Sequence, residues 1–330
     1  MAIAICAASV VNVPDVRKDA RYLEMNSETR SELIVPLFYK GRVIGILDLE
    51  HTRTGYFNEE HERMLTTLAA QIAIAIENAR LYQAVRRQER QLEKDIAMAR
   101  EVQLRLLPAE PPAHTNVVMA VRFLPARTIG GDLYDFLEYG PNQSAIVLGD
   151  VSGKAAPAAL FAALVSGIMR SAAIQRVSPA QMLAQLNDSL QERKLDSQYV
   201  TMLFALWNDE ERVLQVANSG AVQPIVCGGG QSSVIRAEGF PLGMFPDVTY
   251  EEFRIETQPG DAIVFVSDGI LDAENAQDEM YGDERLANML CGHRNLSAGE
   301  IAEAILADVS RFQDGHDRFD DETIIVLKVR

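Results

Sequence analysis

The chain has few cysteines, and their spacing gives no sign of a metal site or a disulfide framework. The three cysteines, Cys6, Cys227 and Cys291, lie far apart and form no Cys-x-x-Cys pair. We therefore expect neither zinc nor disulfides, and this cysteine usage fits a reducing cytoplasm. No apolar run approaches the roughly 20 residues that cross a bilayer. Residues 1–8 are apolar but lack a basic leader, so we interpret them as a buried element rather than a signal peptide.

Positive charge is also scarce. The chain has 31 Lys and Arg against 47 Asp and Glu, which gives a formal net charge of −16. Because phosphate backbones attract basic patches, this balance argues against a nucleic-acid partner. Much of the excess can serve solubility alone. With 330 residues, 48% of them hydrophobic, the chain has room for two domains with ordinary cores.

Residues 1–82 have the pattern of a small α/β unit. Two β-rich runs, residues 32–39 and 42–51, are separated by Lys-Gly, which predicts a hairpin. Asn58 is a candidate cap for the long helical pattern that follows, with two Glu in its favourable first turn. No Gly or Pro interrupts that pattern before Pro108. The sequence therefore predicts an unusually long helix.

The later part of this helix, within residues 83–112, is a predicted linker. Apolar residues recur there every seven positions: Val85, Leu92, Ala99 and Leu106. Gln88 and Asp95 occupy other seam positions and weaken this coiled-coil pattern. Two interpretations stay open: a single solvated helix, or a helix that pairs with a second copy in a parallel dimer.

Residues 113–330 contain predicted strands around a block of two adjacent helices. The strands are residues 117–123, 145–149, 200–207, 213–217, 253–256, 262–267 and 323–329. The helices are residues 155–174, residues 179–193 with Ser178 as cap, and one that begins at Ser297 with a capping box to Glu300. This arrangement predicts an α+β fold of sheets and helices rather than a regularly alternating parallel sheet.

Four short acidic motifs are spread over these residues. They are 130–135 (GGDLYD), 149–154 (GDVSGK), 267–269 (SDG) and 320–323 (DDET). Each places an Asp where a predicted strand ends or a turn begins. Taken singly, such acids can be helix caps or solvated side chains. Together they indicate a metal-dependent hydrolase, because Mg²⁺ and Mn²⁺ prefer carboxylate oxygens and a shared carboxylate can hold two ions.

The order and spacing of these motifs resemble the PPM-type metal-dependent serine/threonine protein phosphatases, in their SpoIIE/RsbU-like bacterial branch. The resemblance also includes residues 99–103, 106–108, 157–160, 218–220 and 241–243. It implies a β-sandwich flanked by helices and a centre of two Mn²⁺ or Mg²⁺ ions. At that centre, a metal-activated water attacks the phosphorus of a phosphoserine or phosphothreonine.

The resemblance also implies roles for individual residues. Asp150 would bridge the two ions and the backbone carbonyl of Val151 would bind one of them. Asp132 would serve the second ion, and Asp150 and Asp132 are the candidate catalytic residues. Asp268 would help to complete the first ion's site.

The last motif carries two adjacent acids. Asp320 lies three residues before Thr323, which is the spacing of the family's motif, so we favour it as the remaining ligand and keep Asp321 as an alternative. Arg127 is a candidate contact for the substrate phosphate. Two positions depart from the family pattern: Ala155 replaces a frequent Gly, and Ala221 replaces a frequent His. Neither change removes an implied metal ligand.

Residues 1–82 resemble the C-terminal half of a GAF sensor domain, chiefly through residues 45–49 and 76–82. The expected architecture is therefore a truncated GAF-like α/β domain, a helical linker and a phosphatase domain at residues 113–330. The resemblance implies a cytoplasmic enzyme acting on a phosphorylated STAS-type anti-anti-sigma factor in a partner-switching pathway. We expect a homodimer through the linker helix and no membrane partner. The alternative is a non-catalytic sensor or scaffold with a degenerate phosphatase domain.

Overall fold

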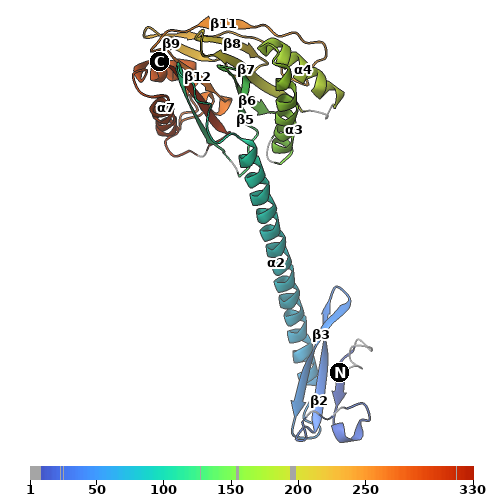
Figure 1. Ribbon diagram of the computed structural model, residues 1–330. Helices are drawn as coiled ribbons and strands as arrows, with labels where there is room; N and C mark the ends of the chain where they lie inside the picture. Colours follow the sequence, from blue (N-terminus) through green and yellow to red (C-terminus); the bar gives the residue numbers. More distant parts are fainter. Residues whose placement is uncertain are drawn as a thin grey trace. The chain divides into compact units, whose positions relative to one another are not determined.

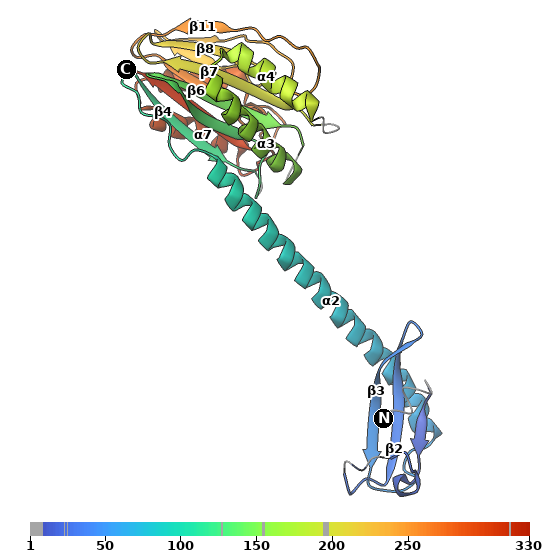
Figure 2. The same cartoon turned by 45° about the vertical axis from the view of Figure 1, so that its right-hand side comes forward.

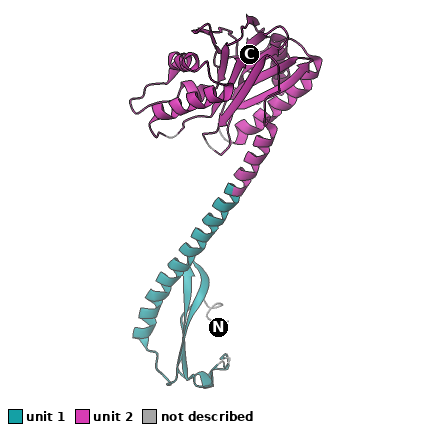
Figure 3. Ribbon diagram, turned by 60° about the vertical axis from the view of Figure 1, so that its left-hand side comes forward, with its two compact units in different colours: residues 1–93 teal, residues 94–330 magenta. Residues whose placement is uncertain are grey.

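The computed structural model describes residues 9–22, 24, 26–126, 128–153, 156–193, 198–316 and 318–330. The chain divides into two compact units, residues 1–93 and 94–330 (Figure 3). Three sequence predictions lie outside the described residues: the buried element at residues 1–8, the phosphate contact of Arg127, and the effect of Ala155 on a helix start.

The first unit is a three-stranded antiparallel sheet packed against a helix. Its elements are β1 (Val11–Val13), the 3-10 turn η1 (Val16–Lys18), β2 (Ser31–Tyr39), β3 (Arg42–His51) and the long helix α2 (Glu59–Leu106). The predicted hairpin is confirmed, because β2 pairs with β3 and Lys40 and Gly41 turn with positive φ. Asn58 caps α2 as predicted, accepting a hydrogen bond from the His61 backbone N–H at 3.0 Å.

The second unit contains two five-stranded antiparallel sheets (Figure 1). One sheet has the order β10 (Gln231–Val234), β9 (Ile225–Gly228), β12 (Ala262–Val266), β13 (Glu322–Val329) and β4 (Val117–Leu124). The other has the order β11 (Phe253–Glu256), β8 (Val213–Asn218), β7 (Val200–Asn208), β6 (Gln143–Val151) and β5 (Leu133–Gly140). Buried side chains from both sheets, including Trp207, Phe265 and Ile325, fill the space between them.

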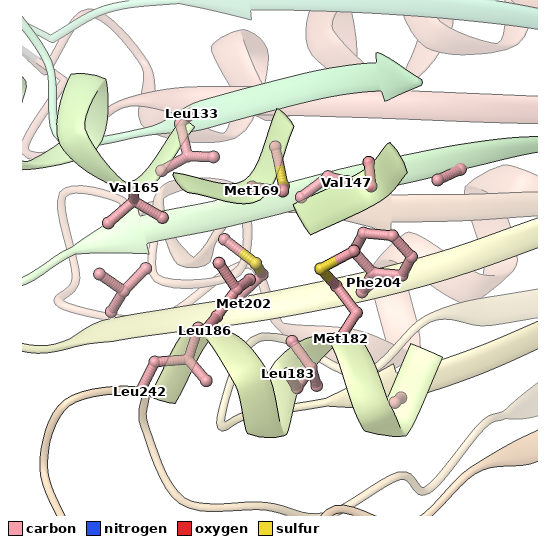
Figure 4. Packing of buried hydrophobic residues seen from close by; sticks show 14 of the residues in the cluster. Leu133, Val147, Val165, Met169, Met182, Leu183, Leu186, Met202, Phe204 and Leu242 are labelled. Atoms are coloured by element: carbon pink, nitrogen blue, oxygen red, sulfur yellow. The ribbon is translucent and has the colours of Figure 1, made fainter. Parts of the chain in front are cut away.

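Helices cover both outer faces of this sandwich. They are α3 (Ala156–Ala172), η2 (Ala173–Gln175), α4 (Pro179–Glu192), α5 (Asp268–Leu271), α6 (Gly282–Gly292) and α7 (Ala298–Gln313). Helices α3 and α4 lie side by side on the β5–β8 sheet, and α7 lies on the other sheet (Figure 2). Met169, Met182 and Phe204 belong to the core beneath α3 and α4 (Figure 4). The predicted β-sandwich flanked by helices is confirmed.

The sequence pattern missed β1, β5, β9, β10, α5 and α6. In β5, acids interrupt the apolar run, and Asp135 is nevertheless buried. Strands β9 and β10 are only four residues long each and meet at a Gly-rich turn, so they carry little period-two pattern. The two capping boxes, at Ser178 and Ser297, are confirmed.

The expectation that the chain has no disulfide was wrong. Cys227 on β9 and Cys291 on α6 are bonded, with an S–S distance of 1.97 Å and 5.5 Å between their Cα atoms. They are 64 residues apart in sequence, and they meet because α6 packs on β9. Cysteine spacing therefore carried no information about this contact, and cysteine usage does not indicate a reducing compartment.

One helical stretch among the described residues, Ala156–Gln175, is long and apolar enough to cross a membrane, with a mean hydropathy of 1.6. This differs from the expectation that no run approaches such a length. In the structure, the stretch comprises α3 and η2, and its Phe161, Val165 and Met169 are buried in the core that it shares with α4. The apolar composition is thus used, at least on that face, for packing on the sheet.

Candidate active site

Antiparallel pairing brings the four acidic motifs together at one end of the sandwich. Asp150 lies at the end of β6, and Asp132 immediately precedes β5, the strand paired with it through Leu133 and Gly149. Asp268 follows β12, and the Asp320-Asp321 doublet precedes β13, which pairs with β12. Because the end of one strand adjoins the start of its antiparallel neighbour, residues far apart in sequence become neighbours.

Three of these acids, Asp150, Asp320 and Asp321, line a cleft of about 230 Å³, whereas Asp132 and Asp268 are not among its lining residues. Its walls include Gly131, Asp150, Val151, Ser152, Tyr199, Phe319, Asp320 and Asp321. No Lys or Arg belongs to the lining among the residues that the structure describes. The cleft therefore gathers negative charge with no compensating side-chain cation on its described walls.

Burial and the charge of neighbouring carboxylates raise the pKa of Asp150 and of Asp268. Burial, followed by the charges of Asp268, Asp320 and Asp321, raises the pKa of Asp150 to about 7. Burial, followed by the charge of Asp320, also raises the pKa of Asp268. Carboxylates crowded in this way favour either a proton or a bound cation.

Two glycines permit the close approach of the site's backbone. A Cβ atom at Gly131 would lie 2.9 Å from Asp150 Oδ1 and 3.0 Å from the carbonyl oxygen of Val151. A Cβ atom at Gly130 would overlap the carboxylate of Asp321. The GG pair of the first motif is therefore a packing requirement of the cleft.

The two acids of the doublet have different surroundings. Asp321 is buried, and its Oδ1 accepts a hydrogen bond from the Ala126 backbone N–H at 2.9 Å. Its Oδ2 accepts a longer one from the Asp132 backbone N–H, at 3.4 Å. Asp320 is partly exposed and lines the cleft. Both acids line the cleft, but Asp321 accepts hydrogen bonds from two backbone N–H groups of the preceding loop, whereas the more exposed Asp320 accepts one from the Asp321 N–H at 2.9 Å.

Asp132 does not line the cleft. It is only 2% exposed, and its Oδ2 accepts a hydrogen bond from the Thr323 hydroxyl. Burial is the main cause that raises its pKa well above the usual range, and the charges of Asp150 and Asp321 add to this. Its carboxylate therefore lies near the other acids but is directed toward buried Thr323 and not into the cleft.

The donor chemistry fits a divalent cation, but the ligands are not assembled as a finished site. Within the described residues, no group of three His, Cys, Asp or Glu side chains is placed to hold an ion. Even so, the charges of Asp268 and Asp320 help to raise the pKa of Asp150, and the Val151 carbonyl lies beside Asp150 near Gly131. Oxygen donors with excess negative charge suit Mg²⁺ or Mn²⁺.

Gln103 belongs to residues 99–103, for which the sequence indicated no individual role. Gln103 belongs to the last turns of α2 and is 8% exposed. Its Nε2 donates to the Gly130 carbonyl at 2.7 Å, and its Oε1 accepts from the Gly130 N–H at 3.2 Å. The end of the long helix is thus hydrogen-bonded to the loop that carries Asp132. The available signal was its place in residues 99–103, one of the runs that carry the family resemblance.

Two further residues support the site and were also missed. The Ser267 hydroxyl donates to the Asp321 carbonyl and accepts from the Thr323 N–H, both at 2.9 Å, so it links the SDG and DDET motifs. Asp135, which is 1% exposed, accepts a hydrogen bond from Arg170 at 2.8 Å. This pair ties α3 to β5, next to Asp132.

Comparison with known proteins identifies the families of both units. A sequence model of the Stage II sporulation protein E (SpoIIE) family matches residues 140–330, and one of the GAF domain matches residues 4–77. Phosphoserine phosphatase RsbU of Bacillus subtilis is 26% identical over 249 residues, which are 75% of this chain and 73% of RsbU.

Solved structures agree with this assignment. The SiaA-PP2C domain of Pseudomonas aeruginosa superimposes with a TM-score of 0.65 at 22% identity, over 73% of this chain and 97% of that domain. RsbX, crystallised in complex with magnesium, gives a TM-score of 0.50 at 16% identity, over 66% of this chain and 98% of RsbX. The family match and the similarity to RsbU identify the second unit as a PP2C-type serine/threonine phosphatase, and its fold agrees with this class. The chain belongs to the SpoIIE family.

Proposed function

We propose that this chain is a Mn²⁺- or Mg²⁺-dependent phosphatase that removes phosphate from phosphoserine or phosphothreonine of a protein. The observation that carries this proposal is the cleft lined by Asp150, Asp320 and Asp321, in which the charges of these two neighbours and of Asp268 help to raise the pKa of Asp150. Asp150, the Val151 carbonyl, Asp268 and Asp320 would hold the ions. Asp132 would contribute by way of Asp150, its neighbour across the β5–β6 pair.

Two divalent ions, when bound, would activate water and neutralise charge on the phosphate oxygens. The chain's own residues prepare for this chemistry. Gly131 lets the Asp150 carboxylate and the Val151 carbonyl converge, and Asp321 fixes the Ala126 and Asp132 backbone. A preorganised site of this kind reduces the reorganisation that would otherwise raise the barrier.

The direct test is hydrolysis of p-nitrophenyl phosphate by the purified chain, with metals removed and then restored. We expect no turnover in excess EDTA and turnover after addition of Mn²⁺ or Mg²⁺. Calorimetry should detect divalent-ion binding in the same samples. Absence of both binding and turnover would contradict the proposal and favour the alternative, a non-catalytic sensor or scaffold.

For the substrate, we propose a phosphorylated STAS-domain protein of a partner-switching pathway that controls a sigma factor. The similarity to RsbU over 75% of the chain supports this class. The location that follows from this substrate is the cytoplasm. We propose residues 1–82 as the GAF-like sensor domain, 83–112 as the linker and 113–330 as the phosphatase domain. A phosphoprotein pull-down with the Asp150→Asn variant would test the substrate class.

We also propose that α2 pairs with α2 of a second copy. The heptad residues Val85, Leu92 and Leu106 are 50%, 61% and 42% exposed in the single chain, and Val102 is 61% exposed. An apolar seam of this kind is buried when two helices pair. Light scattering should show a dimer for the wild type and a shift toward monomer for Leu92→Glu. A monomeric wild type at about 10–50 μM, a range suited to weak coiled coils, would contradict the proposal.

A further inference from the structure

An uncharged loop of the second unit presents aromatic side chains to solvent. This loop, residues 240–246, is the middle part of the connection between β10 and β11 (residues 235–252) and reads FPLGMFP. Phe240, Met244 and Phe245 are 59%, 37% and 47% exposed. The rings of Phe240 and Phe245 meet edge to face with centroids 5.3 Å apart, so they form one surface rather than two scattered side chains. Contiguous exposed apolar surface with aromatic residues is typical of protein-interaction sites.

The 240–246 loop is held firmly although it has little regular structure. Leu242 is fully buried and packs in the core beneath α4 (Figure 4). Buried Asn187 donates to the Phe245 carbonyl at 3.0 Å and accepts from the Gly243 N–H at 2.9 Å. The Tyr250 hydroxyl donates to the Phe240 carbonyl at 3.1 Å. A surface ordered in advance loses less conformational entropy when a partner binds.

The loop is continuous with the wall of the acidic cleft. Leu242 and Val200 exchange two backbone hydrogen bonds, of 3.0 and 2.7 Å. The residue before Val200 is Tyr199, which lines the cleft. Tyr199 is in turn joined to Ser152, another lining residue, because its N–H donates to the Ser152 hydroxyl at 2.9 Å and its carbonyl accepts from the Ser152 N–H at 3.0 Å. A protein whose phosphorylated residue enters the cleft therefore has the loop beside it.

We propose that the 240–246 loop is the docking surface for the phosphoprotein substrate, a folded protein with apolar side chains near its phosphorylated residue. This inference rests on the proposed function of the cleft. Residues 240–246 include no charged residue, so the loop would bind a partner through apolar contacts, while the cleft would bind the phosphate. An anionic membrane is disfavoured as an occupant, because the chain carries a net charge of −16. If the loop instead binds a second copy of the chain, light scattering of the loop variants will show the loss of a dimer.

The test compares two substrates with the double variant Phe240→Ala/Phe245→Ala. One is p-nitrophenyl phosphate, which is too small to reach the loop from the cleft, and the other is a serine-phosphorylated STAS-domain protein. We expect KM for the protein to rise about tenfold to a hundredfold, because exposed aromatic anchors dominate binding energy at interfaces. Turnover of p-nitrophenyl phosphate should stay within about twofold of the wild type. The single variant Met244→Glu, which introduces charge into the same surface, should raise KM in the same direction.

The matched control is Ile174→Ala, since Ile174 is an apolar residue of η2 that is 81% exposed. It should leave both substrates unaffected. Thermal unfolding of every variant, and light scattering, accompany the kinetics. Unchanged protein kinetics in both loop variants, equal losses on both substrates, or loss of a dimer in the loop variants would overturn the docking proposal. If the wild type hydrolyses neither substrate, the proposed function is contradicted instead. If it hydrolyses only p-nitrophenyl phosphate, the phosphorylated STAS-domain protein is not the partner that docks on the loop.

Discussion

Each unit of the molecule contains a group of crowded carboxylates, and the two groups differ in what their oxygens face. In the first unit, burial, then the charge of Asp48, raises the pKa of Glu32 to about 7. In the second unit, burial and the neighbouring acids raise the pKa of Asp150 to the same value. A raised pKa therefore records crowding and does not by itself identify a metal site.

The two groups of carboxylates differ in their hydrogen-bond partners and in their surroundings. Glu32 hydrogen-bonds to Asp48, and Glu50 accepts a hydrogen bond from the Thr29 hydroxyl at 2.5 Å. Asp150, by contrast, lies on the wall of a cleft beside Asp320 and a backbone carbonyl. The first group is arranged to keep a proton between neighbouring strands, and the second lines the cleft at which we propose that a cation binds.

The largest effect expected from this difference concerns activity. Asp150→Asn should lower metal-supported turnover of p-nitrophenyl phosphate by about a thousandfold or more, because it removes the proposed bridging carboxylate. The matched control, Glu32→Gln, makes the same acid-to-amide change in the other group and should leave turnover within about twofold. Equal losses of turnover in Asp150→Asn and Glu32→Gln would contradict the proposal that only the second group takes part in catalysis.

A smaller effect is expected from the support of the site. Gln103→Ala removes two hydrogen bonds to the Gly130 backbone. Each such bond contributes about 0.5–1.5 kcal/mol, so we expect about a tenfold increase in the Mn²⁺ concentration needed for half-maximal activity. Gln88→Ala, an exposed change on the same helix, is the control. Superimposable Mn²⁺ titrations for Gln103→Ala and the wild type would contradict a role of this contact in ordering the loop.

The smallest effect concerns the stability of the first unit as a function of pH. The pKa of the Glu32 carboxyl is 4.5 without the fold and about 7 within it. Because the folded state binds this proton more tightly than the unfolded state, protonation of Glu32 favours folding. This contribution is fully present below about pH 4.5 and is lost as the pH rises through about 7.

Glu32→Gln should remove this dependence and stabilise the first unit at pH 8 by about 1 kcal/mol, a modest value because Asp48 and Glu50 are exposed and screened by solvent. Thermal unfolding at pH 5 and pH 8 would measure it. A wild-type unit that is more stable at pH 8 than at pH 5 would reverse the sign and contradict the assignment.

Much of the fold was predictable because its signals are local. The hairpin at Lys40-Gly41 and the caps at Asn58, Ser178 and Ser297 depend on a few adjacent residues, and all four are confirmed. The disulfide was not predictable, because it depends on how α6 lies on β9. No spacing within the sequence contains that information.

The candidate site was predictable as a set of residues but not as a geometry. The motifs named the acids, and the structure places Asp150, Asp320 and Asp321 on one cleft. It also turns Asp132 inward to Thr323 and commits Asp321 to backbone N–H groups. These differences arise from long-range pairing, which sequence patterns do not specify. The role of Gln103 was hidden for the same reason, since its partner lies 27 residues away.

The position of β13 has a consequence for the order in which the cleft is made during synthesis. β13 lies in the interior of its sheet, between β12 and β4, and β4 precedes it by nearly the whole second unit. Because the Ser267 hydroxyl also bonds to Asp321 and Thr323, the SDG and DDET motifs take up their positions only together. A nascent chain therefore displays the GGDLYD and GDVSGK motifs long before it has a cleft, and it gains the cleft only once β13 has left the ribosome.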